Sequence, residues 1–131
     1  MKTIPSTQSG FTLVELLIVV VIIGLLASIA IPKFKSVRER AYMSAARADL
    51  RNLANLQDVY YNDHYAYSSS QTDLEFYGTD GVIFTIAEAT NLGWAASAVH
   101  AALPADACAI YHGNAAALAP AVTASSVQCT R

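Results

Sequence analysis

The stretch GFTLVELL, residues 10–17, opens an apolar run that continues to Ile31. As an α-helix, the 21 residues Phe11–Ile31 would extend for roughly 31 Å, close to the ~30 Å hydrocarbon thickness of a bilayer. The run contains one charged residue, Glu15. A carboxylate inside a membrane helix costs on the order of 2.5–3.5 kcal/mol at the bilayer centre, so such residues are functional by default. The sequence therefore predicts a membrane-spanning helix whose acid has a cationic partner close by.

Cleavage between Gly10 and Phe11 would create that cation, a new α-amino group at the start of the helix. A short polar leader, the sequence Gly-Phe-Thr-Leu-Val-Glu-Leu-Leu and a long apolar run resemble the prepilin signature of type IV pilins, which the pseudopilins of type II secretion share. The resemblance covers Gly10 to about Pro32. It implies that a membrane-embedded prepilin peptidase removes the leader, residues 1–10, and methylates the Phe11 amino group, which keeps its positive charge.

A conventional signal peptide is the alternative interpretation of the same run, with cleavage after Ala27 or Ala30. Ordinary secretory signals place their apolar region before the cut and discard it. Here the apolar region follows Gly10, which favours the prepilin interpretation.

Bulk charge and the resemblance disagree about membrane topology. Four cations, Lys33, Lys35, Arg38 and Arg40, follow the apolar run, whereas Lys2 alone precedes it, so the positive-inside rule would place the C-terminal domain in the cytoplasm. The resemblance implies the reverse, an inner-membrane subunit that later joins an extracellular pilus filament. We follow the resemblance because the cleavage motif is more specific than a charge count.

The net charge of −2 gives no electrostatic case for nucleic-acid binding.

Two residues that disfavour helices lie in the apolar run. Gly24 costs about 1 kcal/mol relative to alanine in a helix interior, and Pro32 lacks an amide donor and crowds the carbonyl of Ser28. Both are tolerated in membrane helices, so a harmless kink at Pro32 is one expectation. The resemblance implies a further one, that the backbone from Gly24 to Pro32 is helical in the monomer and extended in the filament.

An amphipathic pattern replaces the apolar one after Pro32. Apolar residues recur at steps of three and four among charged ones, and no glycine or proline interrupts them before Gly78. We therefore expect the helix to continue to about residues 61–65, a total of roughly 50–55 residues, far more than a usual globular helix. One stripe is available to pack against a sheet: Leu50, Leu53, Leu56 and Tyr60.

The remainder predicts a small antiparallel sheet. Residues 82–86, 94–101 and 107–112 have the composition of strands with short connections, which indicates a meander with one face on the helix and the other toward water or a neighbouring subunit. Residues 62–81 form the connection and should pack through Leu74, Phe76 and Tyr77. We expect residues 115–124 to be mostly loop, with a short edge strand.

Cys108 and Cys129 are the only cysteines, and their spacing matches no zinc signature. A metal site would need His64, His100 or His112, which are more simply explained as surface or core residues. A disulfide in an oxidising compartment is the interpretation we adopt, and closing such a loop contributes on the order of 3 kcal/mol. By the resemblance, residues 113–128 would be a variable, exposed patch of the filament.

No catalytic motif is present, and we expect neither enzymatic activity nor a cofactor or metal. The predicted fold is α+β, a long helix on a small antiparallel sheet, as in type IV pilins. The predicted segments are a leader at 1–10, a membrane and filament-core helix at 11–32, an amphipathic helix at 33–65 and a globular head at 66–131.

The resemblance implies a filament subunit whose partners are copies of itself, the inner membrane, a prepilin peptidase and an assembly machinery. Phe11, Glu15, Gly24 and Pro32 would carry assembly. Adhesion, motility and DNA uptake are the expected uses of such a filament. A type II secretion pseudopilin or minor pilin is one alternative, although the cysteine loop favours a pilin. A membrane-anchored binding module that never polymerises is the other.

Overall fold

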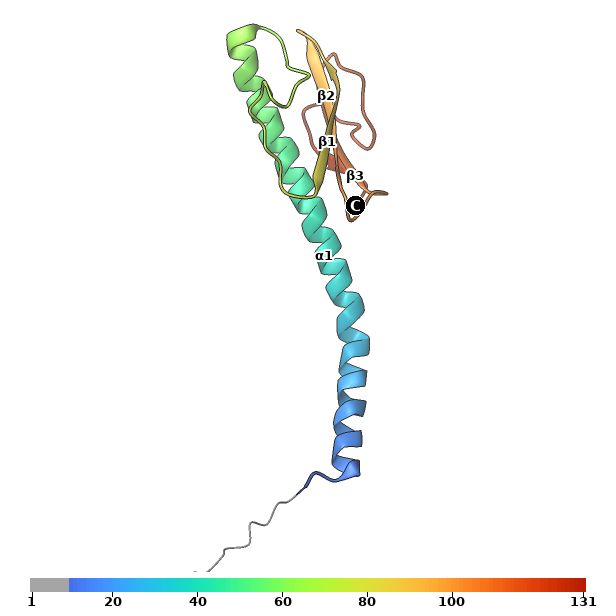
Figure 1. The fold of residues 1–131 in the computed structure, drawn as a ribbon. Coiled ribbons are helices and arrows are strands. Elements are labelled where there is room, and N and C mark those ends of the chain that lie inside the picture. Colours follow the sequence, from blue (N-terminus) through green and yellow to red (C-terminus); the bar gives the residue numbers. More distant parts are fainter. Residues whose placement is uncertain (1–9) are drawn as a thin grey trace, which may run out of the picture. The chain divides into compact units, whose positions relative to one another are not determined.

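The computed structural model describes residues 10–131 and confirms the predicted α+β fold (Figure 1). The predicted leader, residues 1–10, lies outside the described residues except for Gly10. The chain divides into two compact units, of which the first ends at Val37 and the second is Arg38–Arg131. The elements are α1 (Leu13–His64), β1 (Val82–Ala89), β2 (Gly93–His100), β3 (Ala107–Gly113) and β4 (Gln128–Cys129).

Helix α1 has 52 residues, within the predicted length, and contains Pro32 without interruption. It ends at His64 because Tyr65 adopts a left-handed backbone conformation, with φ of 52°. The Tyr65 N–H still donates to the Tyr61 carbonyl at 2.8 Å, and the ring of His64 stacks on Tyr60 with ring centroids 3.9 Å apart. The last turn is therefore stabilised locally by aromatic residues.

The four strands form one antiparallel sheet in the order β1-β2-β3-β4, which confirms the predicted meander. A bulge between Ile86 and Glu88 lets β1 continue to Ala89, beyond the predicted end at Ile86. Residues 115–124 contain no strand, so the edge strand expected there is wrong. The edge of the sheet is instead β4, which pairs Cys129 with Cys108 of β3.

One face of the sheet packs on the second half of α1, where Figure 1 shows the strands beside the helix. Leu50 and Leu53 are fully buried, as the predicted stripe requires, while Leu56 and Tyr60 are half-buried at the edge of the core. Trp94 of β2 is the largest fully buried side chain. The core residues are Met43, Ala46, Leu50, Leu53, Leu74, Phe76, Trp94, Ala96, Ala98, Cys108 and Ile110.

The opposite face of the sheet is not open to water over β2 and β3, contrary to the sequence-based expectation. Ala95 and Ala109 alternate with core residues along their strands, and both are buried. Ala121 in the segment after β3 is also buried, and the Tyr111 hydroxyl donates to the Val122 carbonyl at 3.1 Å. The C-terminal loop therefore folds over this face of the sheet.

The connection between α1 and β1 packs through Leu74 and Phe76, as predicted. Tyr77 does not, because its side chain is 92% exposed. The connection is held at two points by polar side chains of α1. Asp49 accepts bonds from the backbone N–H and hydroxyl of Thr79 at 2.8 and 3.1 Å.

Gln57 of α1 is the other anchor of the connection, and it is completely buried. Its amide nitrogen donates to the Ser68 carbonyl at 2.7 Å, and its amide oxygen accepts from the Ser68 N–H at 2.9 Å. Both backbone groups of Ser68 are thus paired by one side chain, as buried polar groups must be.

Replacing Gln57 by leucine should destabilise the head, because the N–H and C=O of Ser68 would stay buried without partners. An unpaired buried group costs about 1–3 kcal/mol, so we expect the free energy of unfolding to fall by at least about 2 kcal/mol. Urea unfolding in detergent, followed by the fluorescence of Trp94, measures this.

Gln71→Leu is the matched control, since Gln71 makes one long bond of 3.4 Å to the Phe84 carbonyl and is half-buried. Equal destabilisation by the two substitutions would contradict the anchoring role of Gln57.

Candidate assembly site

The N-terminus of α1 is closed by reciprocal contacts between Thr12 and Glu15. The Glu15 Oε2 atom accepts bonds from the Thr12 backbone N–H at 2.8 Å and from the Thr12 hydroxyl at 2.7 Å. In return, the Thr12 hydroxyl oxygen accepts from the Glu15 N–H at 3.2 Å. This arrangement is a capping box, which satisfies backbone N–H groups that lack partners at the start of a helix. Glu15 therefore has a local role in forming α1.

The role of Thr12 was not predicted, although the signal was present in the sequence. A threonine followed three residues later by a glutamate, just before an apolar run, is the sequence pattern of a capping box. The prediction considered the charge of Glu15 and not its capacity to bind the backbone, so it missed this contact.

The capping contacts direct the Glu15 carboxylate toward the start of α1. The Thr12 N–H that it binds is one residue from the Phe11 nitrogen, which cleavage would convert to an amine. Phe11 is 82% exposed, and among the described residues no atom lies within 4 Å of a Cβ built on Gly10. The predicted cleavage site is accessible, and the acid lies at the same end of the helix.

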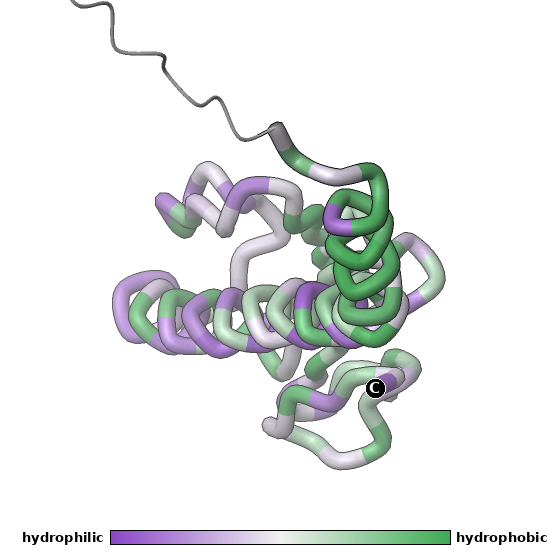
Figure 2. The backbone as a smooth tube through the Cα atoms, turned by 90° about the horizontal axis from the view of Figure 1, so that it is seen from below, coloured by the Kyte–Doolittle hydropathy of each residue, from purple (hydrophilic) through white to green (hydrophobic). Residues whose placement is uncertain are grey.

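The first part of α1 presents apolar side chains all around its surface. The large apolar residues from Leu13 to Ile31 are 47–79% exposed, and the helix is long and apolar enough to cross a membrane. Figure 2 shows this part of the tube as an almost uninterrupted apolar stretch. Such a surface is stable only in apolar surroundings, which a bilayer or the helices of neighbouring subunits would supply.

Gly24 and Pro32 lie within continuous helix in this structure. Within the described residues, a Cβ built on Gly24 would meet nothing within 4 Å, so packing in the single subunit does not require a glycine there. The Ser28 hydroxyl donates to the carbonyl of Leu25 at 2.7 Å. The segment from Gly24 to Pro32 therefore contains a flexible glycine, a serine whose hydroxyl is hydrogen-bonded to the backbone, and a proline that lacks an amide donor.

Cys108 and Cys129 form a disulfide that links β3 to β4. Cys108 is fully buried against the core, whereas most of residues 113–125, which lie between the two cysteines, are exposed. The predicted residues therefore fall into two groups. Gly10, Phe11, Glu15, Gly24 and Pro32 belong to the first unit, and the disulfide belongs to the second.

The three histidines have other contacts in the head. The ring of His100 stacks on Tyr42 with centroids 3.9 Å apart, His112 Nδ1 lies 2.7 Å from the Ser125 hydroxyl oxygen, and His64 stacks on Tyr60. Within residues 10–131, no group of three or more His, Cys, Asp or Glu side chains is arranged to hold a metal ion.

Comparison with known proteins gives one family match in the N-terminal segment and relatives that match about half of the chain. The family model described as the prokaryotic N-terminal methylation motif matches residues 5–31. The type II secretion system core protein G of Pseudomonas aeruginosa is 43% identical over 68 residues, which is 52% of this chain and 48% of that protein. The type IV major pilin protein of Myxococcus xanthus is 42% identical over 67 residues, 51% of this chain and 30% of that protein.

The type IV wide pilus major component of Thermus thermophilus is 42% identical over 65 residues, half of each chain. The chain spans about half the length, or less, of these curated relatives. Pilins and a secretion pseudopilin are similar to the chain to almost the same degree. Motif, similarity and fold all relate the chain to type IV pilins and to the core protein of type II secretion, and none of these relatives bears the name of an enzyme.

Replacing Thr12 by valine removes the capping hydroxyl while keeping the shape of the side chain. We expect the first turn of α1 to fray, because losing an N-cap side chain costs about 1 kcal/mol, and amide exchange there should rise by roughly fivefold. Hydrogen exchange in detergent micelles, measured by NMR at Leu13–Leu16, tests this. Thr12→Ser keeps the hydroxyl and should exchange like the parent; identical exchange in all three proteins would show that the capping box has no energetic role.

Proposed function

We propose that the chain is a structural subunit of a type IV pilus, which polymerises through α1 into an extracellular filament used for adhesion, motility or DNA uptake. The observation that carries the proposal is the position of Glu15. It is the only charge in the apolar segment, and its carboxylate is directed to the end where cleavage would create an amine. The methylation motif over residues 5–31 supports the same processing.

Processing would precede assembly. A prepilin peptidase would cut between Gly10 and Phe11 and methylate the new amine, which remains positively charged. The subunit would then wait in the inner membrane with the apolar part of α1 inserted. An assembly machinery driven by ATP hydrolysis would lift it out of the bilayer and into the growing filament.

Assembly would pair Glu15 of an arriving subunit with the Phe11 amine of a neighbour. The capping contacts use only Oε2, and within the described part of the chain Oε1 has no hydrogen-bond partner. The carboxylate can thus keep the capping box and accept an amine at the same time. Inside an apolar filament core an unpaired charge is strongly unfavourable, so this pair would select one register over all others.

Gly24 and Pro32 would permit a second change during assembly. In the single subunit the segment between them is helical. Because glycine lowers helix stability by about 1 kcal/mol and proline removes a hydrogen bond, this segment is the easiest part of α1 to extend. Extension would let the apolar segments of neighbouring subunits adjust to one another while the heads remain folded.

A type II secretion pseudopilin is the second candidate, favoured by the 43% identity to core protein G of that system. The Cys108–Cys129 disulfide supports the pilin instead, because such a C-terminal loop is expected of pilins by the resemblance. The two candidates share the N-terminal chemistry and differ in the structure that the subunit builds.

Cells that express the chain should release it in long filaments when they are sheared, and Glu15→Gln should reduce the recovered filament by more than about tenfold. The substitution leaves the Phe11 amine without its partner, which costs several kcal/mol in an apolar core. Electron microscopy and immunoblotting of the sheared fraction measure both, with Asp58→Asn as the control that should assemble, since Asp58 is an exposed acid of α1 with no ion pair among the described residues.

Normal filament yield from Glu15→Gln would contradict the proposed charge pair. Recovery of the chain only in short periplasmic fibres, with protein export lost on its deletion, would favour the pseudopilin. A chain found only as single subunits in the membrane would identify a binding module that does not polymerise.

Replacing Gly10 by leucine should block processing, since the small residue before the cleaved bond is part of the motif. The protein should then be recovered at the mass of the precursor without N-methylation, as intact-mass spectrometry would show. Gly24→Ala is the control and should be processed normally, because it has space for a Cβ and lies away from the cleavage site. Mature mass for both variants would place the cleavage elsewhere, for example after Ala27 or Ala30.

A further inference from the structure

We propose that the second unit binds a short peptide with free ends, about three residues long, in a cavity between α1 and the sheet. The cavity has a volume of about 530 Å³, within the roughly 300–1,000 Å³ of sites that bind small ligands. Every residue that lines it belongs to the second unit, Arg38–Arg131. The site therefore lies within one folded unit and does not depend on how the chain assembles.

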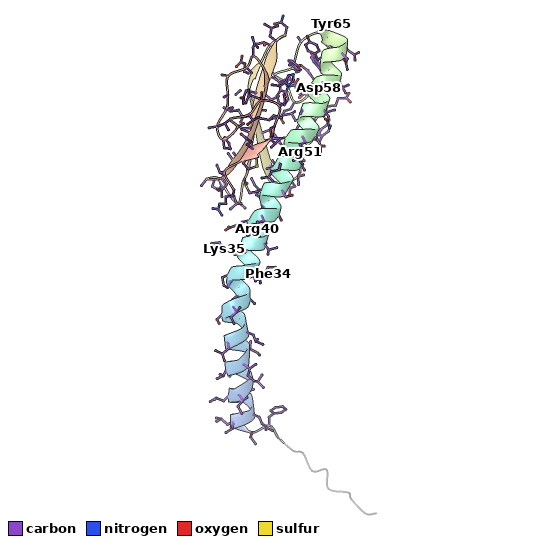
Figure 3. All side chains as sticks on the ribbon, turned by 180° about the vertical axis from the view of Figure 1, so that it is seen from behind. Phe34, Lys35, Arg40, Arg51, Asp58 and Tyr65 are labelled. Atoms are coloured by element: carbon purple, nitrogen blue, oxygen red, sulfur yellow. A yellow bond between two sulfur atoms is a disulfide. The ribbon has the colours of Figure 1, made fainter. Side chains whose placement is uncertain are left out.

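One wall of the cavity is a polar stripe of α1. Arg51, Asn55 and Asp58 follow one another at steps of four and three residues, so they lie on one side of the helix. Figure 3 shows Arg51 and Asp58 on the part of α1 that lies beside the sheet. The cation and the anion are roughly 10 Å apart along the helix axis. The stripe therefore has a positive end, an amide in the middle and a negative end.

Both charges of the stripe are available to a ligand. Arg51 and Asp58 are exposed, and within the described part of the chain neither forms an ion pair. The other titratable side chain of the cavity, His112, is already in contact through Nδ1 with the Ser125 hydroxyl oxygen, at 2.7 Å. Charges of opposite sign at the two ends favour a ligand with a carboxylate at one end and an ammonium group at the other.

The sheet contributes a hydrogen-bond donor that has no partner. Trp94 of β2 lines the cavity and is 1% exposed, and across residues 10–131 its indole N–H has no acceptor. A buried donor without an acceptor is unfavourable. A ligand that places a carbonyl oxygen against this N–H removes the penalty, which an apolar ligand cannot do.

Trp94 and Asp58 belong to the same end of the cavity. The ring centroids of Trp94 and Tyr67 are 6.4 Å apart. Burial, and after it the nearby Asp58 carboxylate, raises the pKa of the Tyr67 hydroxyl, so Asp58 acts on the aromatic group that neighbours Trp94. The ligand therefore needs an ammonium group and a carbonyl close together at this end.

The first residue of a peptide meets both needs, because it carries the free ammonium group and a carbonyl. Each residue of an extended chain spans about 3.3 Å, so three residues cover the roughly 10 Å between Asp58 and Arg51. The carboxylate then lies at Arg51, whose guanidinium binds both carboxylate oxygens, and the Asn55 amide pairs with the central peptide group. The peptide is thus oriented with its amino end at Asp58 and its carboxyl end at Arg51.

Calorimetric titration of the full chain with trialanine tests the site, in a polyoxyethylene detergent whose headgroup carries neither charge nor sugar. We expect a dissociation constant below about 1 mM for a ligand of this size. Trp94 is the only tryptophan, so a change in its fluorescence over the same concentrations locates the ligand in the cavity. Absence of heat and of any fluorescence change up to about 10 mM trialanine would overturn the proposal.

Capped peptides test the orientation. N-acetylation removes the ammonium group and should weaken binding to the parent chain about fivefold, without further weakening binding to Asp58→Asn. Amidation of the carboxyl end should weaken binding to the parent chain about fivefold, without further weakening binding to Arg51→Gln. The opposite pairing of caps and variants would show that the assigned orientation is wrong, and equal effects in all three proteins would exclude both ion pairs.

Arg40→Gln and Asp63→Asn are the charge-matched controls. Both residues are exposed charges of α1 in the second unit, and neither lines the cavity. Both variants should bind trialanine like the parent chain, whereas equal loss in cavity and control variants would overturn the site, since only net charge would then matter. Arg51→Lys keeps the charge and should retain most of the binding, which separates a lost ion pair from lost packing.

Galactose is the competing ligand, because hydroxyl, amide and charged groups also suit a sugar. Binding of galactose without binding of trialanine would overturn the peptide assignment. Filament formation is measured separately from titration. Asp58→Asn should lose its response to the amino end of the peptide and still form filaments, so peptide binding and assembly can fail independently of each other.

Discussion

The need to satisfy one carboxylate in an apolar segment governs the first half of this molecule. The apolar side chains of the segment cannot form hydrogen bonds with Glu15. Its carboxylate binds the backbone N–H and the hydroxyl of Thr12 instead. The capping box satisfies part of the carboxylate and begins the helix in the same step. The remaining oxygen keeps the capacity to bind a cation, so the single subunit is well formed at its N-terminus and still incomplete there. If the chain assembles as proposed, the free and the assembled subunit can share the same helix start.

In the second unit, buried polar groups also need hydrogen-bond partners, and side chains of α1 supply them. Its connection between α1 and β1 has little regular structure, so buried backbone groups must find partners on side chains. Gln57 and Asp49, both on α1, bind Ser68 and Thr79 and hold the connection against the helix. Arg131 binds Glu39 and Asp106, at 2.9 and 3.0 Å, and so joins the end of the sheet to α1. Polar contacts position the segments, while the apolar core supplies most of the stabilisation.

Sequence patterns predicted the features that depend on local periodicity. The long helix, the three main strands, the buried Leu50 and Leu53, and the pairing of the only two cysteines all followed from spacing and composition.

The patterns failed where long-range packing decides. Tyr77 is aromatic and was expected in the core, but of the three residues predicted to pack there only Leu74 and Phe76 are buried, and Tyr77 is exposed. The loop over the outer face was missed because alanines have no strong pattern, and β4 because two residues are too few to show one. At the candidate site, Glu15 was identified by its improbable position, whereas Thr12 is ordinary in composition and acquires its role only through a hydrogen bond.

The thin alanine layer on the outer face of the sheet has a consequence for sequence variation. Ala95 and Ala109 of the sheet are buried there, and Ala115 and Ala121 of the loop are buried as well, so small side chains suffice where the loop lies close to the strands. The loop is also joined to the sheet covalently, through Cys129 and Cys108. It is therefore a ring with fixed ends and a few fixed contacts, while most of its positions face outward. Natural variation or epitope grafting can therefore replace the outward-facing residues without changing the strand register, provided that the buried alanines are kept as small residues.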